Sequence, residues 1–121
     1  MPRVLVAVGL ALALGACGTV PRFTAGSQTI RVRLGRSFQV VLAANPTTGY
    51  FWQLAAPLPA VVSLSGSQYV AGPNARQLAG AGGQEVWTFR AAARGQGEIE
   101  LQYARSAGPA AQSLAFAVRV G

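Results

Sequence analysis

The sequence contains no histidine, no aspartate and no lysine, and it has a single cysteine, Cys17. Without histidine or aspartate, the chain cannot form a Ser-His-Asp or Cys-His catalytic arrangement. The usual zinc ligands are also missing, because one cysteine supplies at most one of the side chains that hold the ion. One cysteine also excludes a disulfide within the chain. The composition therefore argues against a hydrolytic or metal-dependent enzyme, and we expect no cofactor.

The only carboxylate side chains are Glu85, Glu98 and Glu100. Glu98 and Glu100 share one face of an expected strand, whereas a general acid and base normally stand on opposite sides of a substrate in a cleft. We therefore expect all three glutamates to be solvated strand positions. The glycines of the sequence GAGG at 80–83 are not followed by the Lys-Ser/Thr pair of a phosphate-binding loop. The sequence thus predicts a protein that presents loops and is not an enzyme.

Ten arginines against three glutamates give the chain a net charge of +7. Such a charge favours acidic partners or an anionic membrane surface. The arginines are scattered along the sequence and form no basic run, so we expect no nucleic-acid partner.

The first sixteen residues have the composition of a secretory signal peptide. Arg3 is followed by an apolar run at 4–14, which is shorter than the roughly 20 residues of a membrane-spanning helix. The sequence LGAC ending at Cys17 fits the bacterial lipobox, in which the cysteine is acylated and becomes the first mature residue; the alternative is a buried thiol. We predict a signal peptide at 1–16, a lipid anchor on Cys17 and a lipidated tether at 17–26. Gly18 in place of aspartate favours the outer membrane, with the protein held in the bacterial cell envelope.

Apolar and polar residues alternate after the tether, and no helical period follows residue 17. The alternation predicts one domain at 27–121, an all-β, antiparallel β-sandwich of seven to eight strands. We expect this domain to be a monomer. Trp52 is expected on a central strand as a core anchor. The strands are expected at 30–34, 38–42, 50–54, 61–70 (as one or two short strands broken at 65–67), 86–89, 99–103 and 114–120.

The sequence NPTTGY, which begins at Asn45, predicts a tight loop. Asn45 precedes a proline and should be extended, and Pro46 lacks the N–H that strand pairing needs. Gly49 can take positive φ and reverse the chain. Thr47 and Thr48 at the tip offer hydroxyls and backbone groups to an approaching molecule. The same pattern also fits an ordinary β-turn between two strands.

Three stretches in order, NPTTGY, GAGG and the YAR that ends at Arg105, resemble the chagasin-like inhibitors of papain-family cysteine proteases. The resemblance covers roughly 27–120 and implies an immunoglobulin-like sandwich in which three loops at one end form a wedge in the protease cleft. It implies that the loop at 45–49 approaches the catalytic cysteine and that the other two loops flank it. The residues implied to contact the protease are Asn45, Pro46, Thr47, Thr48, Gly49, Tyr50, Gly80, Ala81, Gly82, Gly83 and Arg105.

The third stretch departs from the family pattern, because Ser106 and Ala107 stand where the family has proline and tryptophan. Truncating a tryptophan at the centre of an interface typically costs about 2–4 kcal/mol of binding. Two functions therefore stay open. One is a reversible, loop-wedge inhibitor that binds the active-site cleft of a papain-like protease. The other is a non-inhibitory, immunoglobulin-like envelope lipoprotein that binds another surface protein.

Overall fold

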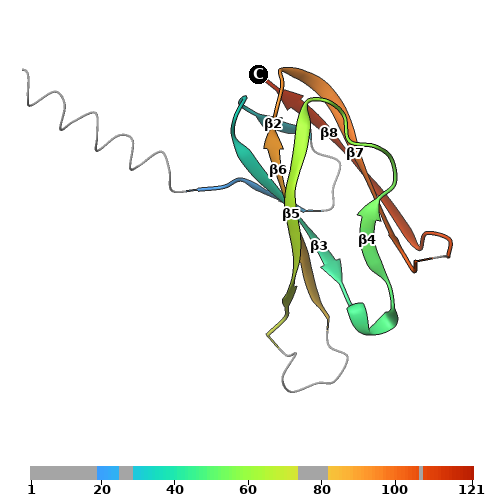
Figure 1. Cartoon of the computed structure of the whole chain (residues 1–121). Helices are drawn as coiled ribbons and strands as arrows, with labels where there is room; N and C mark the ends of the chain where they lie inside the picture. The colour runs from blue at the N-terminus through green and yellow to red at the C-terminus, as the bar shows by residue number, and fades with distance from the viewer. Residues whose placement is uncertain (1–18, 25–28, 74–81, 107) are drawn as a thin grey trace, which may run out of the picture.

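The structure, a computed structural model, describes residues 19–24, 29–73, 82–106 and 108–121. These residues form two four-stranded β-sheets that face each other (Figure 1). The first sheet has the order β1-β3-β6-β5, with bounds Arg22–Thr24, Ser37–Ala44, Gly83–Ala91 and Val62–Ala71. The second has the order β2-β8-β7-β4, with bounds Ile30–Val32, Gln112–Val120, Gly95–Ala104 and Phe51–Leu54. The predicted all-β sandwich is therefore confirmed, with eight strands.

The long strands pair antiparallel, but the two short N-terminal strands pair parallel with their neighbours, β1 with β3 and β2 with β8. Both sheets are consequently mixed. Strand β1 falls inside 17–26, the segment predicted to be a tether. It joins the sandwich because Phe23 packs edge-on against Phe38, with ring centroids 6.3 Å apart.

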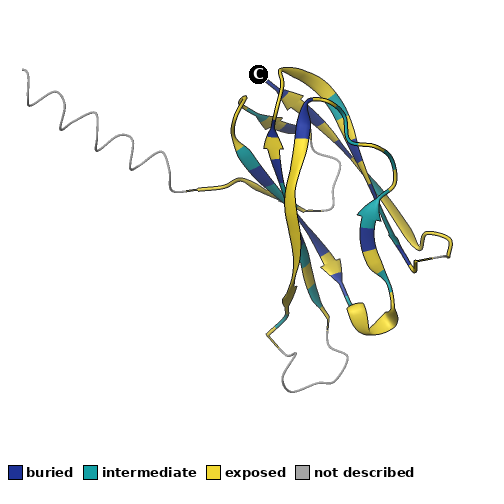
Figure 2. Ribbon diagram, viewed as in Figure 1, coloured by how far each residue is buried: buried dark blue, intermediate teal, exposed yellow. Residues whose placement is uncertain are grey.

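The core lies between the sheets and follows the predicted alternation (Figure 2). On β7, Ile99 and Leu101 are completely buried, whereas Glu98 and Glu100 are exposed. Large fully buried side chains come from both sheets, including those of Phe38, Phe89 and Phe116.

Trp52 is buried as predicted, but its strand β4 is an edge strand and not a central one. Its side chain packs in the core between the sheets, and its indole Nε1 donates a 2.9 Å hydrogen bond to the carbonyl of Ala43 on β3. Trp52 therefore bridges the two sheets. A tryptophan on an edge strand can still anchor the core when its N–H finds a partner in the facing sheet.

Strands β3, β6, β7 and β8 are longer than predicted, and two other strands differ from the prediction in more than length. The stretch 61–70 forms one strand, β5, whose register shifts between Leu64 and Gly66, so the Ser-Gly-Ser sequence makes a β-bulge and does not break the strand. Strand β2 ends at Val32, and Leu34 lies exposed in the turn to β3, where its N–H donates to the carbonyl of Gly121.

Candidate functional site

The loop between β3 and β4 folds into a short 3-10 turn, η1 (Pro46–Thr48). Asn45 caps this turn in an extended conformation, with φ −142° and ψ 93°. Gly49 closes it with φ 81°, and its N–H donates to the carbonyl of Pro46 at 3.1 Å. The conformations predicted for Asn45 and Gly49 are both confirmed.

Hydrogen bonds within the loop hold its shape. The side-chain oxygen of Asn45 accepts bonds from the N–H and the hydroxyl of Thr47, at 3.2 and 2.6 Å. The carbonyl of Asn45 accepts from the N–H and the hydroxyl of Thr48, at 3.2 and 2.7 Å. The sequence predicted that the threonine hydroxyls would be available to a partner. Both instead donate hydrogen bonds within the loop and stabilise its shape.

Every residue from Pro46 to Gly49 is exposed, and the turn stands at the end of the sandwich farthest from the C-terminus (Figures 1 and 2). Asn45 and Tyr50, on either side, are half-buried. The loop is therefore an exposed tip on a partly buried base.

Tyr103 on β7 contacts both residues at the base of the loop, Asn45 and Tyr50. Its hydroxyl accepts a 2.9 Å hydrogen bond from the backbone N–H of Asn45. Its ring packs between those of Tyr50 and Trp52, with centroid distances of 5.5 and 5.1 Å. The loop is thereby fixed to the second sheet at its start and at its end.

Arg105, which directly follows β7, reaches the same loop. Its Nε donates a 3.4 Å hydrogen bond to the carbonyl of Thr48, and its guanidinium carbon lies 4.8 Å from the centroid of the Tyr50 ring. A guanidinium at this distance makes a cation–π contact. The structure therefore brings the first and third predicted stretches together.

The second stretch lies beside the first through strand pairing, because Gly83 on β6 is opposite Ala44 on β3. A Cβ atom on Gly82 would lie 3.0 Å from the carbonyl oxygen of Ala44 and 3.5 Å from the Cβ of Asn45. On Gly83 it would lie 2.2 Å from the carbonyl oxygen of Val70, so only glycine fits. Close packing explains both glycines. Two further predicted contact residues, Gly80 and Ala81, lie outside the described residues, as does Cys17.

Sequence reasoning missed Glu85, which was expected to be solvated. It is half-buried on β6, where one carboxylate oxygen accepts from the backbone N–H of Trp52 at 3.0 Å and the other from the indole of Trp87 at 3.1 Å. The alternation along β6 could have predicted this burial, because Glu85 lies on the same strand face as Trp87 and Phe89.

In the described part of the chain, no three His, Cys, Asp or Glu side chains gather where they could hold a metal ion. No helix there has the length and apolar character needed to span a membrane. The described parts of the three stretches instead lie together around the exposed turn η1.

The comparison with protein families matches residues 31–120 to the family described as chagasin family peptidase inhibitor I42. Among curated proteins, the chain is 32% identical to amoebiasin-1 of Entamoeba histolytica over 93 residues, which are 76% of this chain and 87% of that protein. Among solved structures, it is similar to amebosin, with 29% identity, a TM-score of 0.70 and coverage of 86% and 100% of the two chains. It is also similar to EhICP2, a cysteine protease inhibitor from Entamoeba histolytica, with 22% identity, a TM-score of 0.71 and coverage of 84% and 96%.

Proposed function

Because the chain belongs to the chagasin family, whose members inhibit cysteine proteases and are not enzymes, we propose that it is a reversible, loop-wedge inhibitor of papain-like proteases. The tip at 45–49 enters the active-site cleft, and the stretches at Gly82–Gly83 and Arg105 flank it. The chain acts as a monomer. The observation that carries this proposal is the exposed turn η1 on its half-buried base.

A preformed loop suits this role because ordering a flexible loop on binding consumes part of the interaction free energy. Here the hydrogen bonds of Asn45, the ring of Tyr103 and the contact of Arg105 fix the tip in advance. The same bonds oppose cleavage, since they keep the loop from the extended shape of a protease substrate. Specific inhibitor interfaces bury roughly 800 Å² on each partner, an area that several loops at one end of a sandwich can supply.

Inhibition kinetics test this function. The chain without its signal peptide should inhibit papain competitively with a small peptide substrate, and activity should return on dilution. An absence of inhibition across a panel of papain-like proteases would favour the alternative, a non-inhibitory envelope module. The observation that favours this alternative is Ser106, which stands where the family pattern has proline.

We further propose that the inhibitor is a lipoprotein of the bacterial cell envelope, attached to the outer membrane or its periplasmic face through Cys17. The support is the apolar run at 4–14 followed by LGAC, which ends at this cysteine. Cells fed a clickable palmitate analogue should label the wild-type chain. Equal labelling of the Cys17→Ser variant would contradict the anchor.

A further inference from the structure

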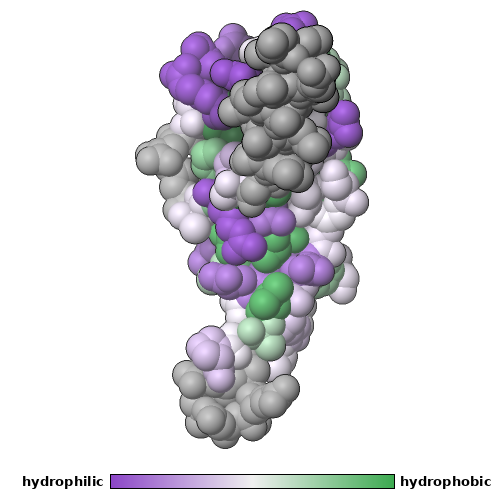
Figure 3. All heavy atoms as spheres, turned by 90° about the vertical axis from the view of Figure 1, so that its left-hand side faces the viewer, coloured by the Kyte–Doolittle hydropathy of each residue, from purple (hydrophilic) through white to green (hydrophobic). Residues whose placement is uncertain are grey.

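Arginines that are scattered in the sequence gather on one surface of the folded domain, here called the basic surface. It consists of Arg31, Arg33, Arg36 and Arg119, which line three neighbouring hollows around β2 and the end of β8. All four are exposed. In Figure 3, hydrophilic residues gather along the upper edges of the molecule, on either side of the atoms drawn in grey.

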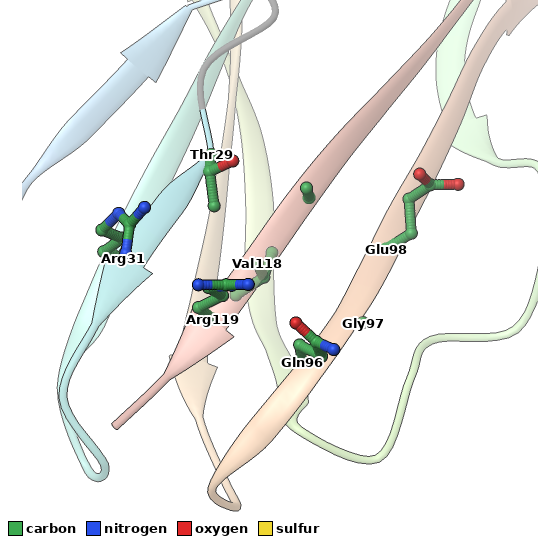
Figure 4. A pocket seen from close by; sticks show the side chains of 8 residues that line it. Thr29, Arg31, Gln96, Gly97, Glu98, Val118 and Arg119 are labelled. Atoms are coloured by element: carbon green, nitrogen blue, oxygen red, sulfur yellow. The ribbon is translucent and has the colours of Figure 1, made fainter.

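The parallel pairing of β2 with β8 creates the centre of this surface. Arg31 and Arg119 are direct partners in the register of the two strands, and their side chains lie next to each other (Figure 4). Arg33 and Arg36 follow in the turn from β2 to β3, which is closed by a 3.0 Å hydrogen bond between their backbone groups. The turn and the strand pair therefore present their guanidinium groups together.

Four guanidinium groups of the basic surface face few carboxylates of the chain: Gly121, the last residue of the sequence, lines one of the hollows together with Arg31, Arg33 and Arg119. Like charges directly opposite on neighbouring strands are unfavourable. Glu98, which lines another of the hollows, stands on β7 away from Arg31 and Arg119 (Figure 4). Throughout the described ranges, none of the four arginines forms an ion pair. An anionic partner would supply the missing countercharge.

The N-terminal segment leads to this same surface. Thr19, Val20 and Pro21 line one hollow together with Arg31, Arg33 and Arg36. The carbonyl of Pro21 accepts a 2.8 Å hydrogen bond from the N–H of Gln39, which fixes the segment where it joins the sandwich. Only Gly18 lies between Cys17 and Thr19, so the two are at most about 7 Å apart in an extended chain.

The tip lies at the other end of the molecule. Strand β3 has eight residues and runs from Ser37, beside the basic surface, to Ala44, which precedes the loop. At about 3.3 Å per residue, this strand separates the two ends by roughly 26 Å. Among the described arginines, Arg105 is the one that makes a hydrogen bond or a cation–π contact with the loop.

We propose that the basic surface binds the anionic lipid headgroups of the membrane that carries the anchor, and so points the tip away from that membrane. The membrane is the partner that fits, because Thr19 lines the same hollow as three of the arginines and follows the anchored residue by only two positions. The Debye length at physiological ionic strength is about 8 Å, so charges close to a membrane surface feel its potential. The orientation rests on the proposed anchor, whereas the affinity of the surface for anionic lipid does not. Each arginine near such a surface should strengthen binding about fivefold.

Vesicle binding tests this proposal with the chain that lacks its signal peptide and carries Cys17→Ser, so that no acyl chain contributes. The probes are vesicles of phosphatidylcholine alone and vesicles that also contain phosphatidylglycerol. The variant Arg31→Gln/Arg119→Gln is compared with Arg105→Glu, which lowers the net charge by the same two units at the opposite end. We expect about 25-fold weaker binding to the anionic vesicles for the first variant and little change for the second.

Equal losses in both variants would overturn the proposal, since net charge alone would then explain binding, and so would equal binding of the parent chain to both vesicles. Circular dichroism checks the fold of each variant. Arg33→Gln, in an exposed turn, is a milder substitution that should weaken binding about fivefold. Papain inhibition by Arg31→Gln/Arg119→Gln should equal that of the parent chain, so failure of the inhibitor function and failure of this surface give different results.

Discussion

The backbone N–H of Trp52 on β4 donates a 3.0 Å hydrogen bond to the carboxylate of Glu85 on β6, from one sheet of the sandwich to the other. The second oxygen of the same carboxylate accepts from the indole of Trp87. Strand β4 follows the tip at 45–49, and β6 begins at Gly83 in the second stretch. One half-buried side chain therefore connects the bases of two of the three loops that we assign to protease binding.

Replacing Glu85 by glutamine should destabilise the domain by about 1–3 kcal/mol, because the amide nitrogen cannot accept the hydrogen bond that a carboxylate oxygen accepts. Urea unfolding measures this loss. The matched control is Glu98→Gln on the exposed face of β7, which should leave the free energy of unfolding unchanged. Equal values for the two variants would mean that Glu85 contributes no more than a solvated residue.

Trp52→Ala should lower the free energy of unfolding by about 3–5 kcal/mol, since it removes a buried aromatic side chain and its hydrogen bond to Ala43. The neighbouring Phe51, which is 42% exposed, provides the control. Phe51→Ala should cost far less in the same urea titration. A loss below about 1 kcal/mol for Trp52→Ala would contradict its role as a bridge between the sheets.

Tyr103→Phe should weaken protease inhibition more than it weakens the fold. The ring stays between Tyr50 and Trp52, but the N–H of Asn45 loses its acceptor. One hydrogen bond contributes only about 0.5–1.5 kcal/mol to stability, whereas a start of the tip that is no longer held must be ordered when the protease binds. The inhibition constant and the urea midpoint should be measured together. An unchanged inhibition constant would show that the tip does not depend on this support.

The local features of this protein could be predicted from the sequence because they depend on near neighbours. Alternation placed Ile99 and Leu101 in the core, and the Asn-Pro-x-x-Gly pattern fixed the conformations of Asn45 and Gly49. The three stretches of the candidate site followed from their resemblance to a family, and strand pairing then brought the described parts of them together.

Features that depend on strands far apart in the sequence could not be predicted in this way. The buried partners of Glu85 come from β4 as well as from its own strand β6, and the pairing of Arg31 with Arg119 requires the parallel contact of β2 with β8. The parallel strand β1 likewise formed within a segment that has no period of its own. In each case the tertiary arrangement decided the environment of the residue.

Gly49→Ala should weaken inhibition with little change in the overall fold. Gly49 has φ 81°, and an added Cβ would meet nothing closer than 3.8 Å, so the change acts through backbone strain of about 1–3 kcal/mol. Gly66→Ala is the matched control, because Gly66 has no positive φ and its Cβ position is open. Inhibition constants for the two variants give the comparison. Equal inhibition constants would contradict the prediction, because binding would then not depend on the shape of the tip.

Restoring the family pattern in the third stretch, with Ser106→Pro and Ala107→Trp, should tighten inhibition of papain. A tryptophan adds a large rigid contact at small entropic cost, and hot-spot tryptophans contribute about 2–4 kcal/mol. A contribution of this size would lower the inhibition constant by at most roughly 30- to 1,000-fold. Ser106→Ala with Ala107→Ser is the control for substitution alone. No gain would indicate that this stretch lies outside the interface.

The occupation of the protease cleft by the tip is tested most directly by the dissociation constant for papain, measured by calorimetry with the cleft free and with the cleft filled. A peptidyl epoxide that bonds covalently to the catalytic cysteine fills the cleft without changing the rest of the enzyme surface. If the loop at 45–49 enters the cleft, filling it should abolish measurable binding. Equal dissociation constants for the free and the filled enzyme would contradict the wedge.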